Sequence, residues 1–283
     1  MRAASKRLGK TQPALTQALR KAESELGAAI FKRSPNGVTA TEEGRIILQR
    51  AGRIQAELIK MQEDVDQRIG SGTGRLNVTV SPLAANRIIP ATIKRFRRRY
   101  PCVQVQISGG HEPMAFAPVR DGAVDIVIGP EPKPADAIGL AVERLIETPV
   151  VIITGLGSRW TGAKTLGDLA AGDWLLIGTP SRVASLQQHF IQRGLLPPTP
   201  VVTSDSIQSI LSLLQDSDFL CTFPGLLLEQ TLANWRIRSI EIDEPLLPAQ
   251  ISTITSSERP PTPAQLHFCD CVRHVAYSEL AGR

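Results

Sequence analysis

A helical stripe of apolar residues, followed by a glycine-rich segment, divides this chain of 283 residues into two parts. The stripe advances in steps of three or four residues and consists of Ile47, Ala51, Ile54, Leu58, Met61, Val65 and Ile69. Because heptad spacing holds these positions on one side of a helix, we expect that side to pair with a second copy of the chain. The alternative is a helix that lies on its own domain. Thr41-Glu42-Glu43 predicts the start of the helix, and Gly70-Ser-Gly-Thr-Gly74 predicts a flexible hinge after it.

The excess of positive charge lies before this stripe. Residues 1–40 contain eight Lys and Arg residues against two acidic residues, whereas the whole chain has 32 against 27. A small basic module on a near-neutral body is typical of proteins that bind a polyanion, most often nucleic acid. The alternative is a solvated basic terminus.

The basic segment has the pattern of a helix-turn-helix. Residues 2–8 predict a short helix that Gly9 ends, and Thr11 then caps a second helix with Pro13 in its first turn. Two helices joined by a short turn that contains glycine form a helix-turn-helix. The polar face of the second helix suits the major groove, because Gln can contact adenine and Arg can contact guanine. We therefore predict that base edges and adjacent phosphates are contacted by Thr11, Gln12, Pro13, Thr16, Gln17 and Arg20.

A basic hairpin is predicted after the second helix. Asn36-Gly37 lies between two short extended runs, and this dipeptide is a strong signal for a two-residue turn. A basic hairpin beside a recognition helix acts as a wing that contacts phosphates or the minor groove. The predicted wing contacts are Lys32, Arg33 and Asn36.

Within the first 45 residues, an ordered set of residues matches a known signature: Thr11 to Thr16, Glu23, Leu26-Gly27, Phe31, Arg33, Gly37-Val38, Thr41 and Gly44. This set resembles the DNA-binding domain of LysR-type transcriptional regulators. The resemblance implies a winged helix-turn-helix over residues 1–41, followed by a dimerising linker helix and hinge over 42–73. Family members usually carry a first helix before this point, so the resemblance also implies that the chain begins inside the second helix and is truncated.

From Arg75 onward, predicted strands and helices alternate, beginning with a strand over 76–80 and a helix over 84–100. Repeated βα units predict parallel sheets with helices on both faces. The predicted fold is α/β with two lobes over 74–283, in which lobe I is 74–148 with 251–283 and lobe II is 149–250. A regulatory domain similar to periplasmic binding proteins is implied by the resemblance of Pro90, Phe96, Tyr100-Pro101, Gly110, Arg120-Asp-Gly122 and Asp125 to the same family.

Several loops of this domain are candidates for a small-molecule site. Ligands of open α/β folds bind beyond the carboxyl ends of the strands and near helix N-termini. The resemblance implies that these loops face a cleft between the lobes and hold a small effector, often an organic anion. Plain helix capping is the alternative for each. The predicted effector contacts are Ser81, Leu83, His111, Thr179, Ser204, Asp205, Thr222 and Pro224.

Other patterns favour neither catalysis nor metal binding. His267, Cys269, Cys271 and His274 lack a common zinc spacing, so we interpret them as part of a closing helix with Phe268 and Val272 in the core. The basic run 94–99 is interpreted as a solvated face or a dimer contact. The sequence contains no G-x-S-x-G, P-loop or H-E-x-x-H motif, and we expect no enzyme activity, cofactor or metal.

The same sequence predicts a cytoplasmic location. There is no secretory signal, and no apolar run approaches the roughly 18 residues that a membrane span needs, so no membrane partner is expected. Four cysteines without dense spacing make no disulfide framework, which indicates reduced thiols.

Together these features predict a DNA-binding transcriptional regulator that controls a promoter in response to a small effector. The expected partners are double-stranded DNA, a small organic anion, a second copy of the chain in a dimer or tetramer, and RNA polymerase. The alternative is a small-molecule-binding protein that has lost DNA binding together with its first helix. The nucleotide sequence upstream of Met1 distinguishes these hypotheses, because only a misassigned start leaves the missing helix encoded in frame.

Overall fold

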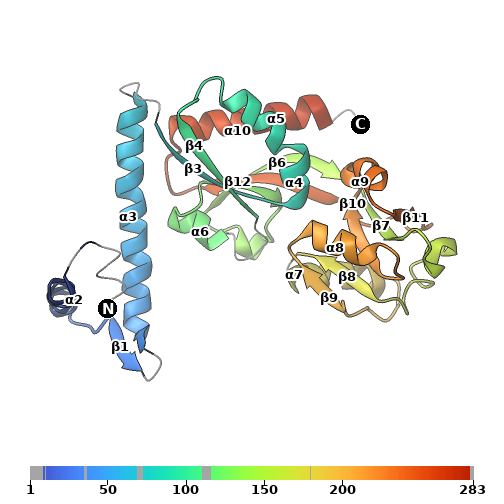
Figure 1. Cartoon of the computed structure of the whole chain (residues 1–283), viewed down its shortest axis with the longest axis horizontal. Coiled ribbons are helices and arrows are strands. Elements are labelled where there is room, and N and C mark those ends of the chain that lie inside the picture. Colours follow the sequence, from blue (N-terminus) through green and yellow to red (C-terminus); the bar gives the residue numbers. More distant parts are fainter. Residues whose placement is uncertain are drawn as a thin grey trace. The chain divides into compact units, whose positions relative to one another are not determined.

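The computed structural model describes residues 9, 11–34, 37–68, 73–109, 116–178 and 180–280. The chain forms two compact units, Met1–Ile59 and Lys60–Arg283, and the long helix α3 (Glu42–Arg68) contributes to both (Figure 1). No helix in the described residues is both long and apolar enough to cross a membrane. The short helix predicted over residues 2–8 lies outside the described residues.

The first unit contains helix α2 (Gln12–Leu26) and a two-stranded hairpin before α3. As predicted, the hydroxyl of Thr11 caps α2, accepting a hydrogen bond from the backbone N–H of Ala14 at 3.4 Å. Gly27 ends the helix with a φ of 67°, a left-handed conformation in which a residue with a Cβ would be strained.

The hairpin pairs β1 (Phe31–Ser34) with β2 (Gly37–Ala40) in antiparallel register. Ser34 lies opposite Gly37, so the two residues between the strands are 35 and 36. The predicted turn dipeptide, Asn36-Gly37, was therefore placed one residue too late, because Gly37 is already paired within β2.

The second unit contains two five-stranded sheets joined by two chain crossings. In the first sheet β3 is parallel to β4 and β5, whereas β12 is antiparallel to its neighbours β5 and β6. Helices α4, α5 and α10 cover one face, and α6 covers the other (Figure 1). The elements are β3 (Gly74–Val80), β4 (Val103–Gly109), β5 (Ile126–Pro130), β6 (Leu140–Thr148), β12 (Ala249–Ser256), α4 (Pro82–Arg87), α5 (Ile89–Phe96), α6 (Phe116–Asp121) and α10 (Pro263–Val275).

The second sheet has the order β11-β7-β10-β8-β9. Its strands β10, β8 and β9 are parallel, and β7 runs antiparallel to both of its neighbours, β10 and β11. Helices α8 and α9 belong to one side of this sheet and α7 to the other. The elements are β7 (Val150–Gly155), β8 (Trp174–Ile177), β9 (Val202–Ser204), β10 (Leu220–Pro224), β11 (Ile237–Ile240), α7 (Pro180–Ile191), α8 (Ile207–Leu214) and α9 (Leu228–Asn234).

Three expectations for this unit were wrong in detail. Both sheets are mixed rather than parallel, because the strands at the two crossings, β6, β7 and β12, run antiparallel to their neighbours. The helix predicted over 84–100 is interrupted at Ile88, which lies between α4 and α5. Pro90 occupies the first turn of α5, a position that favours the start of a new helix. The alternation of strands and helices predicts a helix over 166–170, between strands over 149–154 and 174–177, but this segment forms turns.

The two crossings meet beside the cores of both sheets. The first joins β6 to β7 at Pro149, whose carbonyl accepts a hydrogen bond from the Gly225 N–H at 2.7 Å. A Cβ on Gly225 would lie 2.8 Å from Pro149 Cγ, so glycine permits this close approach. One continuous cluster of buried side chains includes residues from both sheets, for example Val78 of β3 and Leu175 of β8.

Candidate functional sites

Glu23 fixes the path of the chain from α2 to the hairpin. Its carboxylate accepts hydrogen bonds from the backbone N–H groups of Ile30 at 2.8 Å and Phe31 at 3.3 Å. Ile30 is the buried apolar residue of this turn, with 6% of its surface exposed. One acidic side chain therefore holds α2 and β1 in a defined relation, although it lies on the more basic part of the chain.

Thr41 and Gly44 join the hairpin to α3. The Thr41 N–H donates to the carbonyl of Ile30 at 3.0 Å, and the Thr41 hydroxyl accepts from the Gly44 N–H at 2.8 Å, which caps α3 as predicted. A Cβ on Gly44 would lie 1.9 Å from the Ile30 carbonyl oxygen. The start of α3 thus packs backbone to backbone against the turn before β1. Three residues of the matched signature therefore have structural roles, namely Glu23, Thr41 and Gly44.

The predicted recognition residues extend along α2 and are largely accessible. The side chains of Gln12, Gln17 and Arg20 are exposed, and Thr16 is partly buried. The Thr16 hydroxyl donates to the carbonyl of Gln12 at 2.9 Å, so its proton is engaged within the helix. Three of the residues that could contact bases are therefore free to do so without rearrangement of the helix.

Lys32 places an exposed ammonium group on the predicted wing, opposite Thr39 in the hairpin register. Arg33 pairs with Val38 through the backbone of the hairpin. The Arg33 side chain and the whole of Asn36 lie outside the described residues, so their predicted contacts with the DNA backbone stay predictions.

The apolar stripe of α3 is exposed in the single chain. Ile54, Leu58, Met61 and Val65 have between 49% and 63% of their surface exposed. Ile47 is partly buried, and Ile69 lies outside the described residues. A row of large exposed apolar side chains is unusual on a soluble protein and marks a surface that another protein covers.

A cavity of about 390 Å³ lies between residues of the two sheets. Its walls are mainly apolar and include Leu83, Leu176, Ile177, Ile207 and Phe223. Such a volume and lining suit a small organic molecule. The polar residues that line it are Ser81, Glu131, Lys133, Thr148, His189, Thr222 and Gln250.

Four of the predicted effector contacts line this cavity: Ser81, Leu83, Thr222 and Pro224. The hydroxyl of Ser81 also caps α4 by accepting from the Ala84 N–H at 3.3 Å, so the capping interpretation and the site interpretation apply to the same residue. His111 and Thr179 lie outside the described residues.

The other two predicted contacts, Ser204 and Asp205, are not among the residues that line the cavity. The reason is topological, because Ser204 ends β9 and Asp205 follows it, and β9 is the edge strand of its sheet. The Ser204 hydroxyl accepts a hydrogen bond from the Ser206 N–H at 3.1 Å, and Ser206 in turn caps α8. Helix capping thus accounts for this loop.

Two of the polar cavity-lining residues that sequence reasoning missed are Lys133 and His189. Lys133 follows β5 at its carboxyl end, and the general rule for open α/β sheets could have found it. His189 lies near the end of α7, where no sequence signal separates it from an ordinary helical histidine. Burial lowers the pKa of His189, and the positive charge of Arg193 lowers it further, so both effects favour the neutral imidazole.

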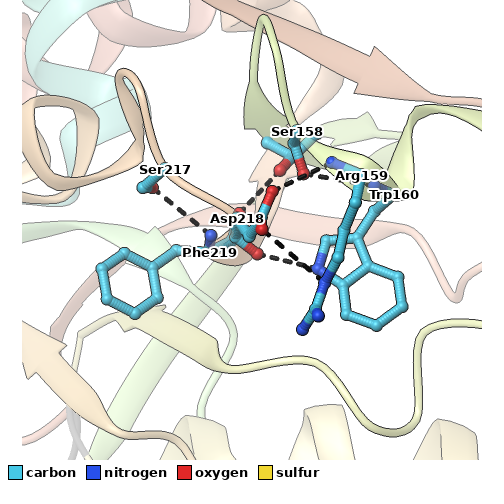
Figure 2. A network of polar contacts seen from close by, with 7 residues as sticks. Ser158, Arg159, Trp160, Ser217, Asp218 and Phe219 are labelled. Atoms are coloured by element: carbon cyan, nitrogen blue, oxygen red, sulfur yellow. Dashed lines mark hydrogen bonds and ion pairs between the residues drawn. The ribbon is translucent and has the colours of Figure 1, made fainter.

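A polar corner around Asp218 supports the strand that carries Thr222 and Pro224 (Figure 2). The Asp218 carboxylate accepts from the Arg159 N–H at 2.9 Å, and its carbonyl accepts from the Trp160 indole N–H at 2.8 Å. The Arg159 N–H, with help from the hydroxyl of Ser158, lowers the pKa of Asp218 because these donors favour the carboxylate. The start of β10 is thereby fixed, which in turn positions its cavity-lining end.

The cysteine and histidine residues of α10 form no metal-binding group within the described part of the chain. Phe268 and Val272 are fully buried, which confirms their predicted place in the core. Cys271 is buried as well, and its sulfur lies 3.6 Å from Nε2 of His267. All four cysteines are free thiols.

Comparison with known proteins places this architecture in a family. Residues 1–45 match the model of the bacterial regulatory helix-turn-helix protein of the lysR family, and residues 70–276 match the LysR substrate binding domain. The chain is 28% identical over 281 residues to the HTH-type transcriptional regulator GalR of Pseudomonas putida, covering 97% of this chain and 70% of that protein.

Two solved structures share the fold. CbnR, a LysR family transcriptional regulator, superposes with a TM-score of 0.68 at 21% identity, covering 98% of this chain and 93% of CbnR. The effector binding domain of QuiR in complex with shikimate gives a TM-score of 0.63 at 12% identity, covering 73% of this chain and 99% of that domain. With both of its parts matched by family models, the chain belongs to the LysR family of helix-turn-helix transcriptional regulators.

Proposed function

We propose that this regulator binds its operator as a homodimer. Its affinity for DNA or its arrangement on the operator changes when a small organic anion fills the cavity between the two sheets. The observation that carries the proposal is the cavity of about 390 Å³, to which both sheets contribute. A ligand held by both sheets stabilises the arrangement of the sheets that contacts it best. An effector can shift a conformational equilibrium only through such a difference in affinity.

The DNA contacts are proposed on α2 and the hairpin. Gln17 and Arg20 meet base edges, and Lys32 and Arg33 meet phosphates. The exposure of the polar side chains of α2 and the rigid Glu23 connection to β1 support this assignment. Thr11 and Pro13 contribute through the N-terminus of α2, where backbone N–H groups attract phosphate.

The dimer contact is proposed on α3. The exposed stripe of Ile54, Leu58, Met61 and Val65 continues over several turns, and pairing it with the same stripe of a second chain buries it. A dimer also carries two recognition helices to two half-sites. Two such dimers would form the tetramer that the sequence leaves open, and RNA polymerase is a proposed further partner at the promoter.

The effector is proposed to be an anion because of the charges that line the cavity. Glu131 is neutralised by Arg144, whose Nε lies 2.7 Å from its carboxylate. Lys133 is exposed, and no ion pair is recorded for it within the described residues. Shikimate, which is bound in the related fold of QuiR, is likewise a small carboxylic acid. We propose no catalytic role for the chain, and four free thiols support a reducing, cytoplasmic location.

Two substitutions test the DNA contacts against each other. Gln17→Ala should relax the preference at one base position, costing about 1–3 kcal/mol at the matched base. Arg33→Ala should weaken binding to all sequences alike and reduce the slope of log K against log salt by about 0.9. Binding is measured by fluorescence anisotropy on the promoter region beside the gene and on single-base variants of it.

Matched controls are Gln49→Ala on α3 and Arg238→Ala on β11, both exposed positions. Neither should change base preference or salt slope. If Gln17→Ala and Arg33→Ala both lower affinity uniformly across sequences, the assignment of α2 as the recognition helix is wrong. If the wild-type chain binds the effector but no DNA, the chain is a small-molecule-binding protein rather than a regulator that works alone.

A further inference from the structure

His189 is a buried polar side chain that lines the mainly apolar cavity. Only 4% of its surface is exposed, and it lines the cavity together with Leu186 of the same helix. Nδ1 is fully buried without a hydrogen-bond partner. In the described part of the chain, the side chain that bonds to His189 is Arg193, which donates to the backbone carbonyl and not to Nε2. A bound molecule that reached Nε2 would meet a ring nitrogen that makes no hydrogen bond within the described part of the chain.

The imidazole can offer that partner a hydrogen bond but no charge. Burial and the neighbouring Arg193 favour its neutral form, in which one ring nitrogen donates and the other accepts. Because Nδ1 is fully buried, Nε2 is the ring nitrogen left to meet a bound molecule. A hydroxyl group suits Nε2 in either tautomer, since a hydroxyl both donates and accepts.

The charge that a ligand needs lies elsewhere in the lining. Lys133 supplies an exposed ammonium group, whereas the nearby Glu131 is held by Arg144 through two contacts of 2.7 and 3.3 Å. Most of the remaining wall consists of apolar side chains, including Ile207 and Phe223. The lining thus combines a cation, apolar walls and a neutral hydrogen-bonding group.

We propose that the effector class is a hydroxycarboxylic acid with an apolar body, whose carboxylate meets Lys133 and whose hydroxyl meets Nε2 of His189. The proposal rests on the proposed effector site and adds its selectivity. His189 is then a specificity residue, which separates hydroxylated acids from their plain counterparts. Serine and threonine side chains of the lining, Ser81 and Thr222, are available to a second polar group of the ligand.

The test uses pairs of acids that differ by one hydroxyl: 4-hydroxybenzoate with benzoate, and 6-hydroxyhexanoate with hexanoate. Affinities for the full chain are measured by isothermal titration calorimetry. In at least one pair the hydroxylated acid should bind about tenfold more tightly, the size expected for one neutral hydrogen bond in a buried site. His189→Leu should remove that preference, and His189→Gln, which keeps a donor and an acceptor, should retain part of it.

Leu186→Met is the matched control, because it changes an apolar wall of the same helix and should alter both members of a pair equally. Circular dichroism and DNA binding establish that each variant is folded. If the acids bind but show no hydroxyl preference, or if His189→Leu keeps the preference, the inference is overturned and the effector site stands. If no acid of either kind binds the folded wild-type chain, both the inference and the organic-anion effector are overturned.

Discussion

Replacing Gly44 by alanine should unfold the first unit at temperatures at which the second remains intact. The new Cβ would lie 1.9 Å from the Ile30 carbonyl oxygen, and real contacts of this kind require more than about 3 Å, so the start of α3 must move away from the turn by about 1 Å or more. That movement breaks the hydrogen bond from Thr41 N–H to Ile30, worth about 1 kcal/mol, and weakens the Thr41 cap, worth about another. Overpacking strain adds about 1–3 kcal/mol.

The expected loss is therefore about 3–5 kcal/mol from the free energy of unfolding of the first unit. Two signals in one thermal melt separate the units. Trp160, Trp174 and Trp235 all belong to the second unit, so tryptophan fluorescence should keep its wild-type midpoint. Far-UV circular dichroism, which includes α2 and α3, should gain an earlier transition. DNA binding should be lost above that transition.

Gly52→Ala is the matched control on the same helix. A Cβ at Gly52 meets nothing within 4 Å, so this change should stabilise α3 by about 0.5–1 kcal/mol through helix propensity alone. The reasoning is refuted if Gly44→Ala melts like the wild-type chain, or if Gly44→Ala and Gly52→Ala shift the helical signal in the same direction.

Two further predictions concern the dimer and the polar corner. Leu58→Glu puts a charge in the exposed stripe and should lower the fraction of dimer measured by analytical ultracentrifugation at micromolar concentration. Glu57→Gln, at the neighbouring position, should leave that fraction unchanged. If Leu58→Glu leaves the dimer intact, the stripe is not the interface. Asp218→Asn should lower the thermal midpoint of the second unit at pH 7 and make little difference well below pH 3.8. The reason is that the pKa of Asp218 is lower in the folded chain than in the unfolded chain. Its carboxylate therefore stabilises the fold at a pH above the unfolded-state pKa, and this effect is lost as the pH falls through the folded-state pKa. An equal decrease of the thermal midpoint at both pH values would contradict this role.

Much of the first unit could be predicted from local chemistry. Thr11, Gly27 and Thr41 mark helix ends because capping depends on residues a few positions apart. The roles of Glu23 and Gly44 were visible only as matches to a signature. Their physical reasons, a carboxylate on two backbone amides and a helix start against a carbonyl, require residues seven and fourteen positions apart to meet.

The sequence patterns predict no strand over 140–148, and β6 shows why periodicity fails where strand pairing is irregular. Its register with β12 shifts between Ile251 and Ser252, so Leu145 is an extra residue on β6. Leu145 and Ile146 are consequently both buried, which destroys the alternation expected of a strand. Conversely, Leu166 and Leu169 have helical spacing and are both buried, but the segment that contains them forms turns.

The cavity-lining residues at strand ends could be predicted from the sequence. Those on helix faces could not, because no sequence pattern marks them. Ser81 and Thr222 follow the rule for the carboxyl ends of parallel strands. Ser204 also ends a parallel strand but does not line this cavity, and the sequence does not reveal that β9 is an edge strand. His189 lines the cavity because it lies on the face of α7 that points toward it. The orientation of that face depends on how α7 packs against the whole sheet.

DNA binding by this chain, measured on the promoter region beside its gene at two salt concentrations, tests the central claim most directly. The account predicts tight binding that resists nonspecific competitor DNA, weakens steeply with salt and changes when an effector acid is added. No binding by the folded chain at either salt concentration, with the dimer intact, would contradict it.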